Sequence, residues 1–356
     1  MKKLTILCLV MFLLVGCGSK KDKVQTNVTG DEASMDSLDD TYYKMIKMPR
    51  SELSEQFYND FSTTNDFEVI GRDLQILSSK HFSTSSYYMS EGQHITREEK
   101  KKLLQRSQEY TLQPKAGTTI EGVLNPVMIS SIQEQDFYVK DGSQYTLKAL
   151  SVAIVIEPRD ANNHVLSTPM SDKAVKDYAK DAMKKFYDYM QNSESMQKLK
   201  DLPMLIAVYQ ASNSEESTMS GKYIFESYCD GKFGDIKTLN HKNVLFSSKE
   251  AEDMDMATYS EFNEIKNNLK KASTEAAGLI GEAKYIDNEI QSMVIEAHLN
   301  VKTYTELLYL TSLLADNIDS KFSNSFDVKT LVYSQDGLKA IIVKNKGESA
   351  QTNILY

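Results

Sequence analysis

The chain has 356 residues, of which 41% are hydrophobic and 26% are charged, and its formal net charge is −9. This composition is typical of a folded protein, and the length predicts two folded units or one large duplicated unit. The acidic balance argues against nucleic acid as a partner, because proteins that bind nucleic acids present basic surfaces.

The N-terminus carries the pattern of an export signal. Two lysines precede an apolar run over residues 4–15, which is shorter than the roughly 20 residues of a membrane-spanning helix. The run ends in Leu14-Val15-Gly16-Cys17, which resembles the lipobox of bacterial lipoproteins. The resemblance implies cleavage after Gly16 and a diacylglyceryl group on the Cys17 sulfur. An ordinary secretory signal with a chance cysteine is the alternative.

We expect residues 1–16 to be the signal peptide and residues 17–40, which are polar, to be a flexible tether. Cleavage changes the formal charge from −9 to −11, because residues 1–16 hold two lysines and no acid. Charge alone would repel such a chain from an anionic membrane, so lipid must hold it at the extracellular face of the cell membrane. The mature chain then keeps one free thiol, Cys229, which lies in a predicted strand and is expected to be buried.

Residues 41–135 form a mixed N-terminal segment. Ser51 can cap a short helix, and Thr96 opens another through a capping box with Glu99. The apolar residues between positions 123 and 132 are expected to be buried.

The following segment predicts a unit of strand, helix, strand and strand. Residues 145–157, 204–211 and 222–229 have strand patterns, and Ser171 caps a helix that extends to about Gln191. A leading strand at residues 136–140 can precede the unit. The helix has an apolar face formed by Val175, Ala179, Ala182, Phe186 and Met190.

The C-terminal quarter repeats this order. Residues 289–299 indicate a strand, Thr303 opens a helix, and residues 328–334 and 338–344 form a hairpin across Asp336-Gly337. A leading strand at residues 283–287 can precede this unit, and Thr258 caps a helix that links the two repeats.

We therefore expect an α+β fold of two related strand–helix–strand–strand units, with mostly antiparallel sheets and a helix on one face of each. The mixed segment and first repeat occupy residues 41–240, and the linking helix and second repeat occupy residues 241–356.

Several short motifs follow one another in a characteristic order. They are the lipobox at Cys17, Tyr87-Tyr88 before Glu91-Gly92-Gln93, Glu134-Gln135-Asp136-Phe137-Tyr138, Asp201-Leu202-Pro203, and the run from Asp336 to Val343. In these motifs the chain resembles the CamS family of Gram-positive lipoproteins, which are called sex-pheromone precursors, over about residues 40–356. The resemblance implies a membrane-anchored extracellular lipoprotein whose folded part has no established activity, and release of a short apolar peptide from residues 9–16.

The sequence has no Gly-x-Ser-x-Gly elbow, phosphate-binding loop, dinucleotide-binding glycine fingerprint or His-Glu-x-x-His motif. Its five histidines are scattered without paired ligand spacing, so we expect no metal site and no cofactor. The acidic run at residues 250–255 could bind a hard cation, but it lacks the glycine and alternating ligands of an EF-hand. We expect that run to be a solvated loop.

A polar group before the Thr96 helix is the candidate ligand site. Tyr87, Tyr88, Glu91 and Gln93 could line a polar pocket. The alternative is that Gly92 permits a turn with positive φ and that its polar neighbours cap the helix.

We predict a non-enzymatic interaction or ligand-binding module for a peptide, wall component or protein, with a groove where the two units meet. The alternative function is a cell-wall or peptide hydrolase that uses a pair of carboxylates.

Overall fold

The structure is a computed structural model that describes residues 27–28, 41–51, 53, 65–106, 109–212, 219–273, 278–322, 325–335 and 337–355. The signal peptide, Cys17 and the helix predicted after Ser51 lie outside these residues. Among the helices in this part of the chain, none is long and apolar enough to cross a membrane.

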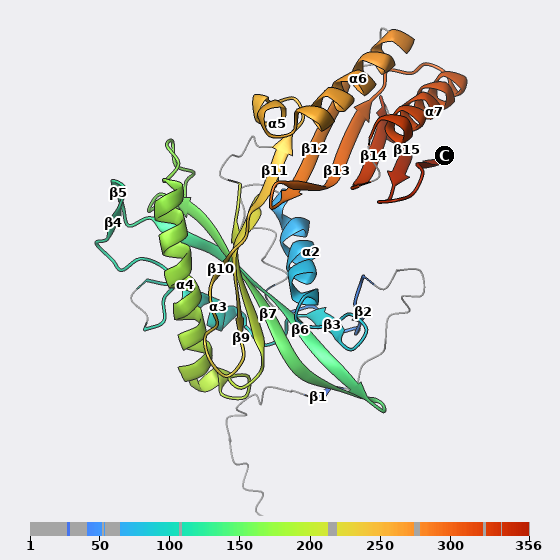
Figure 1. The fold of residues 1–356 in the computed structure, drawn as a ribbon. Coiled ribbons are helices and arrows are strands. Elements are labelled where there is room, and N and C mark those ends of the chain that lie inside the picture. Colours follow the sequence, from blue (N-terminus) through green and yellow to red (C-terminus); the bar gives the residue numbers. More distant parts are fainter. Residues whose placement is uncertain are drawn as a thin grey trace, which may run out of the picture.

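The first unit is built on a sheet with strand order β10-β9-β8-β7-β6-β3-β2, and β1 adds to β7 (Figure 1). A separate hairpin pairs β4 (Thr119–Ile120) with β5 (Val123–Leu124). The helices are α2 (Asn65–Ser79), α3 (Arg97–Leu104) and α4 (Asp172–Asn192), with a 3₁₀ turn at Glu194–Met196. The strands are β1 (Asn27–Val28), β2 (Lys44–Met45), β3 (Tyr88–Glu91), β6 (Val127–Asp141), β7 (Gln144–Arg159), β8 (Met204–Gln210), β9 (Lys222–Cys229) and β10 (Lys237–Thr238).

The second unit is built on a sheet with strand order β11-β12-β13-β14-β15-β16. Its helices are α5 (Lys249–Met254), α6 (Met256–Ala272) and α7 (Tyr304–Lys321). Its strands are β11 (His241–Leu245), β12 (Gly278–Ile286), β13 (Glu289–His298), β14 (Asp327–Ser334), β15 (Gly337–Lys344) and β16 (Gln351–Ile354).

The two units contain the same repeat, as the order of predicted elements required. In the first, β6 and β7 form an antiparallel hairpin, α4 crosses over to β8, and β9 turns back beside β8. In the second, β12, β13, α7, β14 and β15 follow the same course. The strands on either side of each helix are parallel, because a crossover returns the chain in its original direction whereas a short turn reverses it. Each sheet is therefore mostly antiparallel with a parallel pair near its centre, and the first sheet has a second parallel pair, β2 with β3, at its edge.

Helix α4 covers one face of the first sheet, and its start is set by a local cap. The Ser171 hydroxyl accepts a hydrogen bond from the Ala174 N–H at 3.2 Å, which satisfies one of the unpaired donors of the first turn. The five residues of the predicted apolar face are all buried. Helix α2 covers the opposite face, where Ile70, Leu74 and Leu77 pack on the sheet.

Helices α6 and α7 cover one face of the second sheet and enclose a separate apolar core. The predicted cap at Thr258 is wrong. The helix begins at Met256, because Asp255 accepts a hydrogen bond from the Thr258 N–H at 3.1 Å and takes the cap position. Thr258 lies inside the first turn.

The acidic run at residues 250–255 is also not a loop. Its first part forms α5, capped by Ser248, and Lys249 and Asp253 pair across one helical turn at 2.9 Å. Glu250 and Glu252 lie in the first turn, where negative charge favours the positive end of the helix dipole. Across the described ranges, His, Cys, Asp and Glu form no group of three or more that could hold a metal ion.

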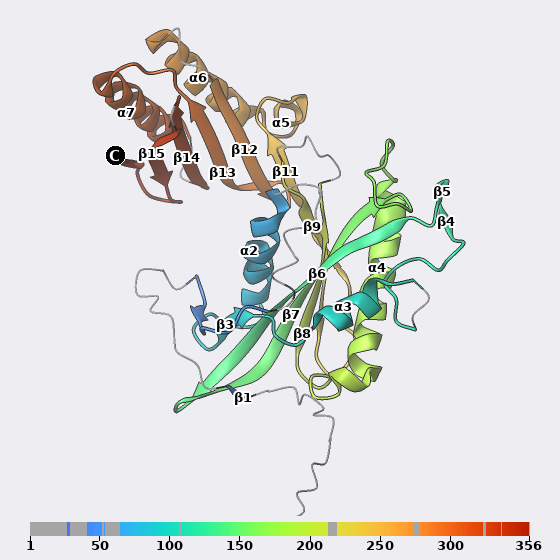
Figure 2. The ribbon, with the colours of Figure 1, turned by 180° about the vertical axis from the view of Figure 1, so that it is seen from behind.

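Figure 2 shows the second unit at one end of the first sheet, with α2 running from the second unit along that sheet. In both views β1 lies at the opposite end of the first unit. The contacts between the units therefore gather around α2 and the start of β9.

Candidate functional site

The two tyrosines of the predicted ligand site pack into different cores. Tyr87 packs in the core under α2, with its ring centroid 5.7 Å from that of Phe82. Tyr88 lies on β3, packs against the core under α4, and meets the Tyr145 ring edge to face at 5.2 Å. The strand alternation of β3 turns neighbouring side chains to opposite faces of the sheet.

Glu91 and Gln93 do lie together, and both fasten the chain near residue 50. Glu91 accepts a hydrogen bond from the Ser51 N–H at 3.2 Å. The Gln93 amide donates to the carbonyl oxygens of Pro49 at 3.1 Å and Glu91 at 3.2 Å. The structure thus brings these two of the four predicted residues into one polar group.

The prediction that Gly92 adopts a positive φ is wrong. Glycine is required by close approach, since a Cβ at this position would lie 2.3 Å from Cβ of Glu134. The Glu134 carboxylate sits beneath the segment and accepts from the backbone N–H groups of His94 at 3.0 Å and Ile95 at 2.8 Å. Thr96 caps α3 as predicted, accepting from the Glu99 N–H at 3.2 Å.

Glu134 and Asp136 form a closely spaced carboxylate pair on one face of β6. Asp136 accepts from the Gln93 N–H at 3.0 Å and from the Tyr138 hydroxyl at 3.3 Å. The Nε2 atom of His94 lies 3.4 Å from the same Asp136 oxygen without making a hydrogen bond. These side chains are buried, and Asp136 has no exposed surface.

The electrostatics of this cluster favour its neutral forms. Burial first, and then the neighbouring Glu134 carboxylate, raise the pKa of Asp136 well above its usual range. Burial lowers the pKa of His94, and Glu134 opposes that change. A buried acid that keeps its proton can donate a hydrogen bond, so the pair is suited to hold residues 92–95 against β6.

A cavity of about 320 Å³ lies between the β4–β5 hairpin and the segment before α4. The Glu121 carboxylate at its edge accepts from the backbone N–H of Ser171 at 2.7 Å and from the Ser171 hydroxyl. These bonds lower the pKa of Glu121 and tie the hairpin to the start of α4. The cavity walls contain one carboxylate and no histidine. They are formed by Glu121, Gly122, Val123, Leu166, Ser167, Thr168, Pro169 and Met170.

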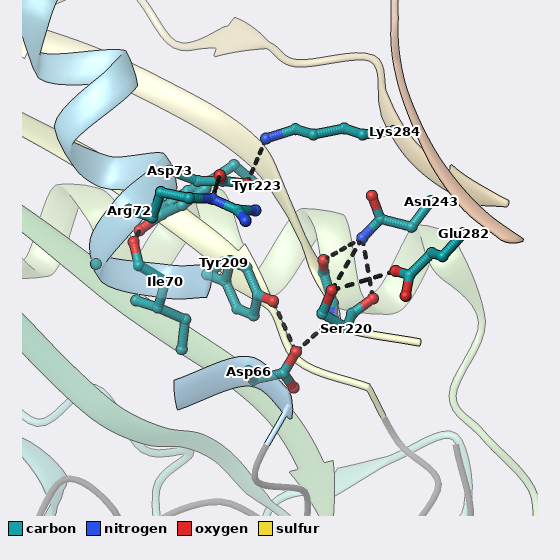
Figure 3. Close-up of polar contacts among 12 residues, drawn as sticks. Asp66, Ile70, Arg72, Asp73, Tyr209, Ser220, Tyr223, Asn243, Glu282 and Lys284 are labelled. Atoms are coloured by element: carbon teal, nitrogen blue, oxygen red, sulfur yellow. Dashed lines mark hydrogen bonds and ion pairs between the residues drawn. The ribbon is translucent and has the colours of Figure 1, made fainter. Parts of the chain in front are cut away.

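The junction between the units is a polar network around α2 (Figure 3). Lys284 of β12 pairs with Asp73 of α2 at 2.5 Å, and Asp73 also pairs with Arg72 at 3.0 Å. Burial lowers the pKa of Lys284, and the Asp73 charge opposes this shift. No sequence pattern predicted this pair, because its members are 211 positions apart.

A second set of contacts joins the start of β9 to the second sheet. The Asn243 amide donates to the carbonyl oxygens of Ser220 at 3.1 Å and Gly221 at 2.8 Å. The Ser220 hydroxyl donates to Glu282 at 3.4 Å, and burial raises the pKa of that glutamate. The groups in this second set of contacts are an amide, a hydroxyl and a carboxylate, joined by hydrogen bonds.

Asp66 fixes the first turn of α2 beside this junction. Its carboxylate accepts from the Tyr209 hydroxyl at 2.7 Å, from the Ser212 N–H at 3.0 Å and from the Gly221 N–H. Asp66 therefore connects α2 to β8 and to the residue just before β9.

Comparison with known proteins gives a family and several solved structures, two of which are described below. The family model described as "CamS sex pheromone cAM373 precursor" matches residues 48–350. No curated protein sequence matches the chain.

The crystal structure of the sex pheromone precursor from Lactobacillus salivarius subsp. salivarius UCC118 is similar at 18% identity, with 92% of this chain and 99% of that chain covered and a TM-score of 0.80. The C-terminal domain of the sex pheromone staph-cAM373 precursor from Staphylococcus aureus is similar at 20% identity, with 83% and 98% covered and a TM-score of 0.67. At these identities the two structures establish a shared fold.

Proposed function

Because the chain belongs to the CamS family of sex-pheromone precursors, we propose that it is an extracellular lipoprotein of the cell membrane, held by a diacylglyceryl group on Cys17. The observation that carries this proposal is the Leu14-Val15-Gly16-Cys17 lipobox after a short apolar run. Membership of a pheromone-precursor family indicates a secreted or surface protein, which agrees with export. Acyl chains contribute about 0.8 kcal/mol per buried CH₂, and two chains hold a protein far more firmly than one.

Replacing Cys17 tests the anchor. The Cys17→Ala variant should accumulate as an unprocessed precursor or appear in the medium, because it offers no sulfur for acylation. Fractionation and intact mass measure both outcomes, with Cys229→Ala as the matched control that keeps the lipobox. A Cys17→Ala protein as membrane-bound and as short as the parent would refute lipidation at this residue.

We propose further that processing of the signal peptide releases an apolar peptide from residues 9–16. Family membership supports this, because the family is described as a pheromone precursor. Mass spectrometry of the culture medium should find a fragment that ends near Val15 or Gly16. Mature lipoprotein without any fragment of residues 4–16 would count against release.

For the folded part we propose a non-enzymatic module in two domains, residues 41–240 and 241–356, that binds a peptide, wall component or protein where the domains meet. The amides and hydroxyls at the junction support binding. Against the hydrolase, the Glu134–Asp136 pair is buried and the cavity wall holds a single carboxylate.

A ligand screen by thermal shift tests binding, with Asn243→Ala expected to weaken any ligand held at the junction. Glu282→Ala tests the same site by removing the other polar side chain that the second unit contributes there. Asn263→Ala on α6 serves as the control. The hydrolase alternative would prevail if the chain cleaved wall fragments or peptides and Glu134→Gln abolished that cleavage in a folded protein.

A further inference from the structure

The path of the N-terminal chain shows which end of the molecule lies next to the anchor. Strand β1 pairs with β7, with Asn27 opposite Thr146 and Val28 opposite Tyr145, at the hairpin end of β6 and β7. Cys17 precedes Asn27 by only 10 residues. Such a chain spans at most about 35 Å when extended and roughly 17 Å on average when flexible. A lipid on Cys17 therefore keeps the β6–β7 hairpin end close to the membrane.

The charged side chains of the folded strands at that end are mostly basic, although the chain as a whole is acidic. Residues 41–48, 84–90 and 137–148 meet there through the pairing of β2 with β3, β3 with β6 and β6 with β7. These three segments contain four lysines and one acidic residue, Asp141, in a chain whose net charge is −9. Residues 18–40 of the tether contain three lysines and six acidic residues, so the positive charge at this end belongs to the folded strands and not to the tether.

Aromatic rings lie beneath two of these lysines. The ammonium groups of Lys44 and Lys140 lie 6.0 and 5.7 Å from the ring centroid of Tyr88, and Lys140 is also 5.4 Å from that of Tyr145. Both lysines are exposed, and Tyr42, two residues before Lys44 in the chain, is 47% exposed. Tyrosine is favoured at membrane interfaces, where its ring contacts apolar groups and its hydroxyl meets water.

We propose that this surface, formed by Tyr42, Lys44, Tyr88, Lys140 and Lys148, faces the membrane and binds the anionic headgroups of its lipids. The proposal rests on the lipid anchor proposed above, which brings the surface within reach of the headgroups. Headgroup attraction extends about one Debye length, 8–10 Å, so it acts only on the end that the tether holds close. The repulsion between the anionic membrane and the net negative charge of the chain then acts on the part of the chain far from the hairpin end.

The orientation places the second unit away from the bilayer. Along β7, Tyr145 and Ile156 are separated by 11 residues, and Ile156 pairs with Gln210, which in turn pairs with Lys222 beside the junction. At about 3.3 Å per residue, the junction lies roughly 35 Å from the hairpin end. The membrane-facing surface and the proposed ligand site therefore lie at opposite ends of the first unit.

Vesicle binding by the mature chain without its lipid tests the surface. Residues 17–356 carrying Cys17→Ala are sedimented with phosphatidylcholine vesicles with and without phosphatidylglycerol. We expect binding to the anionic vesicles that high salt abolishes. Each lysine near an anionic surface changes partitioning about fivefold, so Lys44→Glu/Lys140→Glu should lower it at least twentyfold.

The matched control is Lys270→Glu/Lys329→Glu, which makes the same charge change at exposed residues of the second unit and should change partitioning less than about twofold. Equal losses in the two double variants would attribute binding to net charge and overturn the proposal. Equal or absent binding to both vesicle types would overturn it as well. Because the protein in this assay carries no lipid, its failure leaves the processing of Cys17 to be decided separately.

Discussion

Gly92 shows how a single residue permits the segment after β3 to lie against β6. The space that a side chain would need is already occupied by Glu134, whose carboxylate holds two backbone N–H groups of the same segment. Any larger residue at position 92 must displace either the strand or that carboxylate.

Gly92→Ala should therefore destabilise the first unit by about 1–3 kcal/mol, the usual cost of overpacking a tightly packed site. Urea denaturation followed by circular dichroism measures the change. Gly278→Ala is the matched control, because a Cβ there meets nothing within 4 Å and its φ is not positive. Similar midpoints for Gly92→Ala and the parent protein would show that the strand yields at little cost.

Asp136 gives the folded state a dependence on pH. Its raised pKa means that the folded state keeps a proton that the unfolded state, with a pKa of about 3.9, has lost. The stabilisation is complete below about pH 3.9 and is lost as pH rises toward the pKa of the folded state. Asp136→Asn imitates the protonated acid, so it should match the parent near pH 4 and become relatively more stable at higher pH.

Denaturation of the parent and of Asp136→Asn from about pH 4 upward gives the difference in their free energies of unfolding at each pH. His94, whose lowered pKa destabilises the folded state as pH falls, is present in both proteins. A constant difference between the two proteins at every pH would mean that Asp136 titrates normally.

At this scale the sequence predicted what depends on near neighbours. Thr96 and Ser171 were identifiable as caps because the N–H groups that they accept lie three residues away. The reason for Gly92 was not accessible, because Glu134 is 42 positions further along the chain. The sequence therefore identified Glu91 and Gln93 as one polar group but not the buried carboxylates of Glu134 and Asp136, which accept hydrogen bonds from the backbone beside them.

Among the elements, α2 has the widest influence, since it packs on the first sheet and pairs with the second. Its polar bonds begin at Asp66, where one carboxylate collects donors from Tyr209, Ser212 and Gly221. Removing the Asp66 carboxylate would leave these three hydrogen-bond donors without their acceptor inside the protein.

Asp66→Ala should cost about 2–4 kcal/mol, because buried donors that lose a charged acceptor carry the full penalty of desolvation. Glu68→Ala, in the same turn but exposed, should change stability by less than about 0.5 kcal/mol. Thermal or urea unfolding compares the two variants. Equal losses of stability in Asp66→Ala and Glu68→Ala would mean that Asp66 acts only through its charge near the start of the helix and not through its hydrogen bonds.

Helices with a regular apolar spacing and a side-chain cap were predicted, as α3, α4 and α7 show. Helix α2 was missed, because Gly71 interrupts its pattern and glycine is a poor helix former. Helix α5 was missed because its acidic residues suggested solvent exposure, although acidic residues in a first turn favour a helix.

For the whole molecule, the decisive feature is that the two sheets enclose separate apolar cores and meet through polar contacts. The order of elements predicted the shared connectivity, since each repeat is encoded within about 100 residues. The junction was beyond sequence reasoning, because its partners are far apart in the chain and none belongs to a recognisable motif.

Separate cores should give two calorimetric transitions. The junction contacts break when the less stable unit unfolds, so they stabilise the protein only against the first transition. Asn243→Ala/Lys284→Met should therefore lower the midpoint temperature of the first transition and leave that of the second unchanged. A loss of about 2 kcal/mol corresponds to roughly 4–8 °C for a unit of this size. The matched control is Asn263→Ala/Lys270→Met on α6. A single transition in the parent protein, or a shift of both transitions in the junction variant, would contradict independent cores.

The position of Cys229 has a practical consequence. It is buried at the end of β9, burial raises the pKa of its thiol, and residues 241–356 contain no cysteine. A thiol reagent needs the exposed thiolate, so it can react only in molecules whose first sheet has opened. The rate of alkylation at Cys229 thus reports the opening of the first unit alone. A ligand that lowers this rate must stabilise the first unit, directly or through the junction.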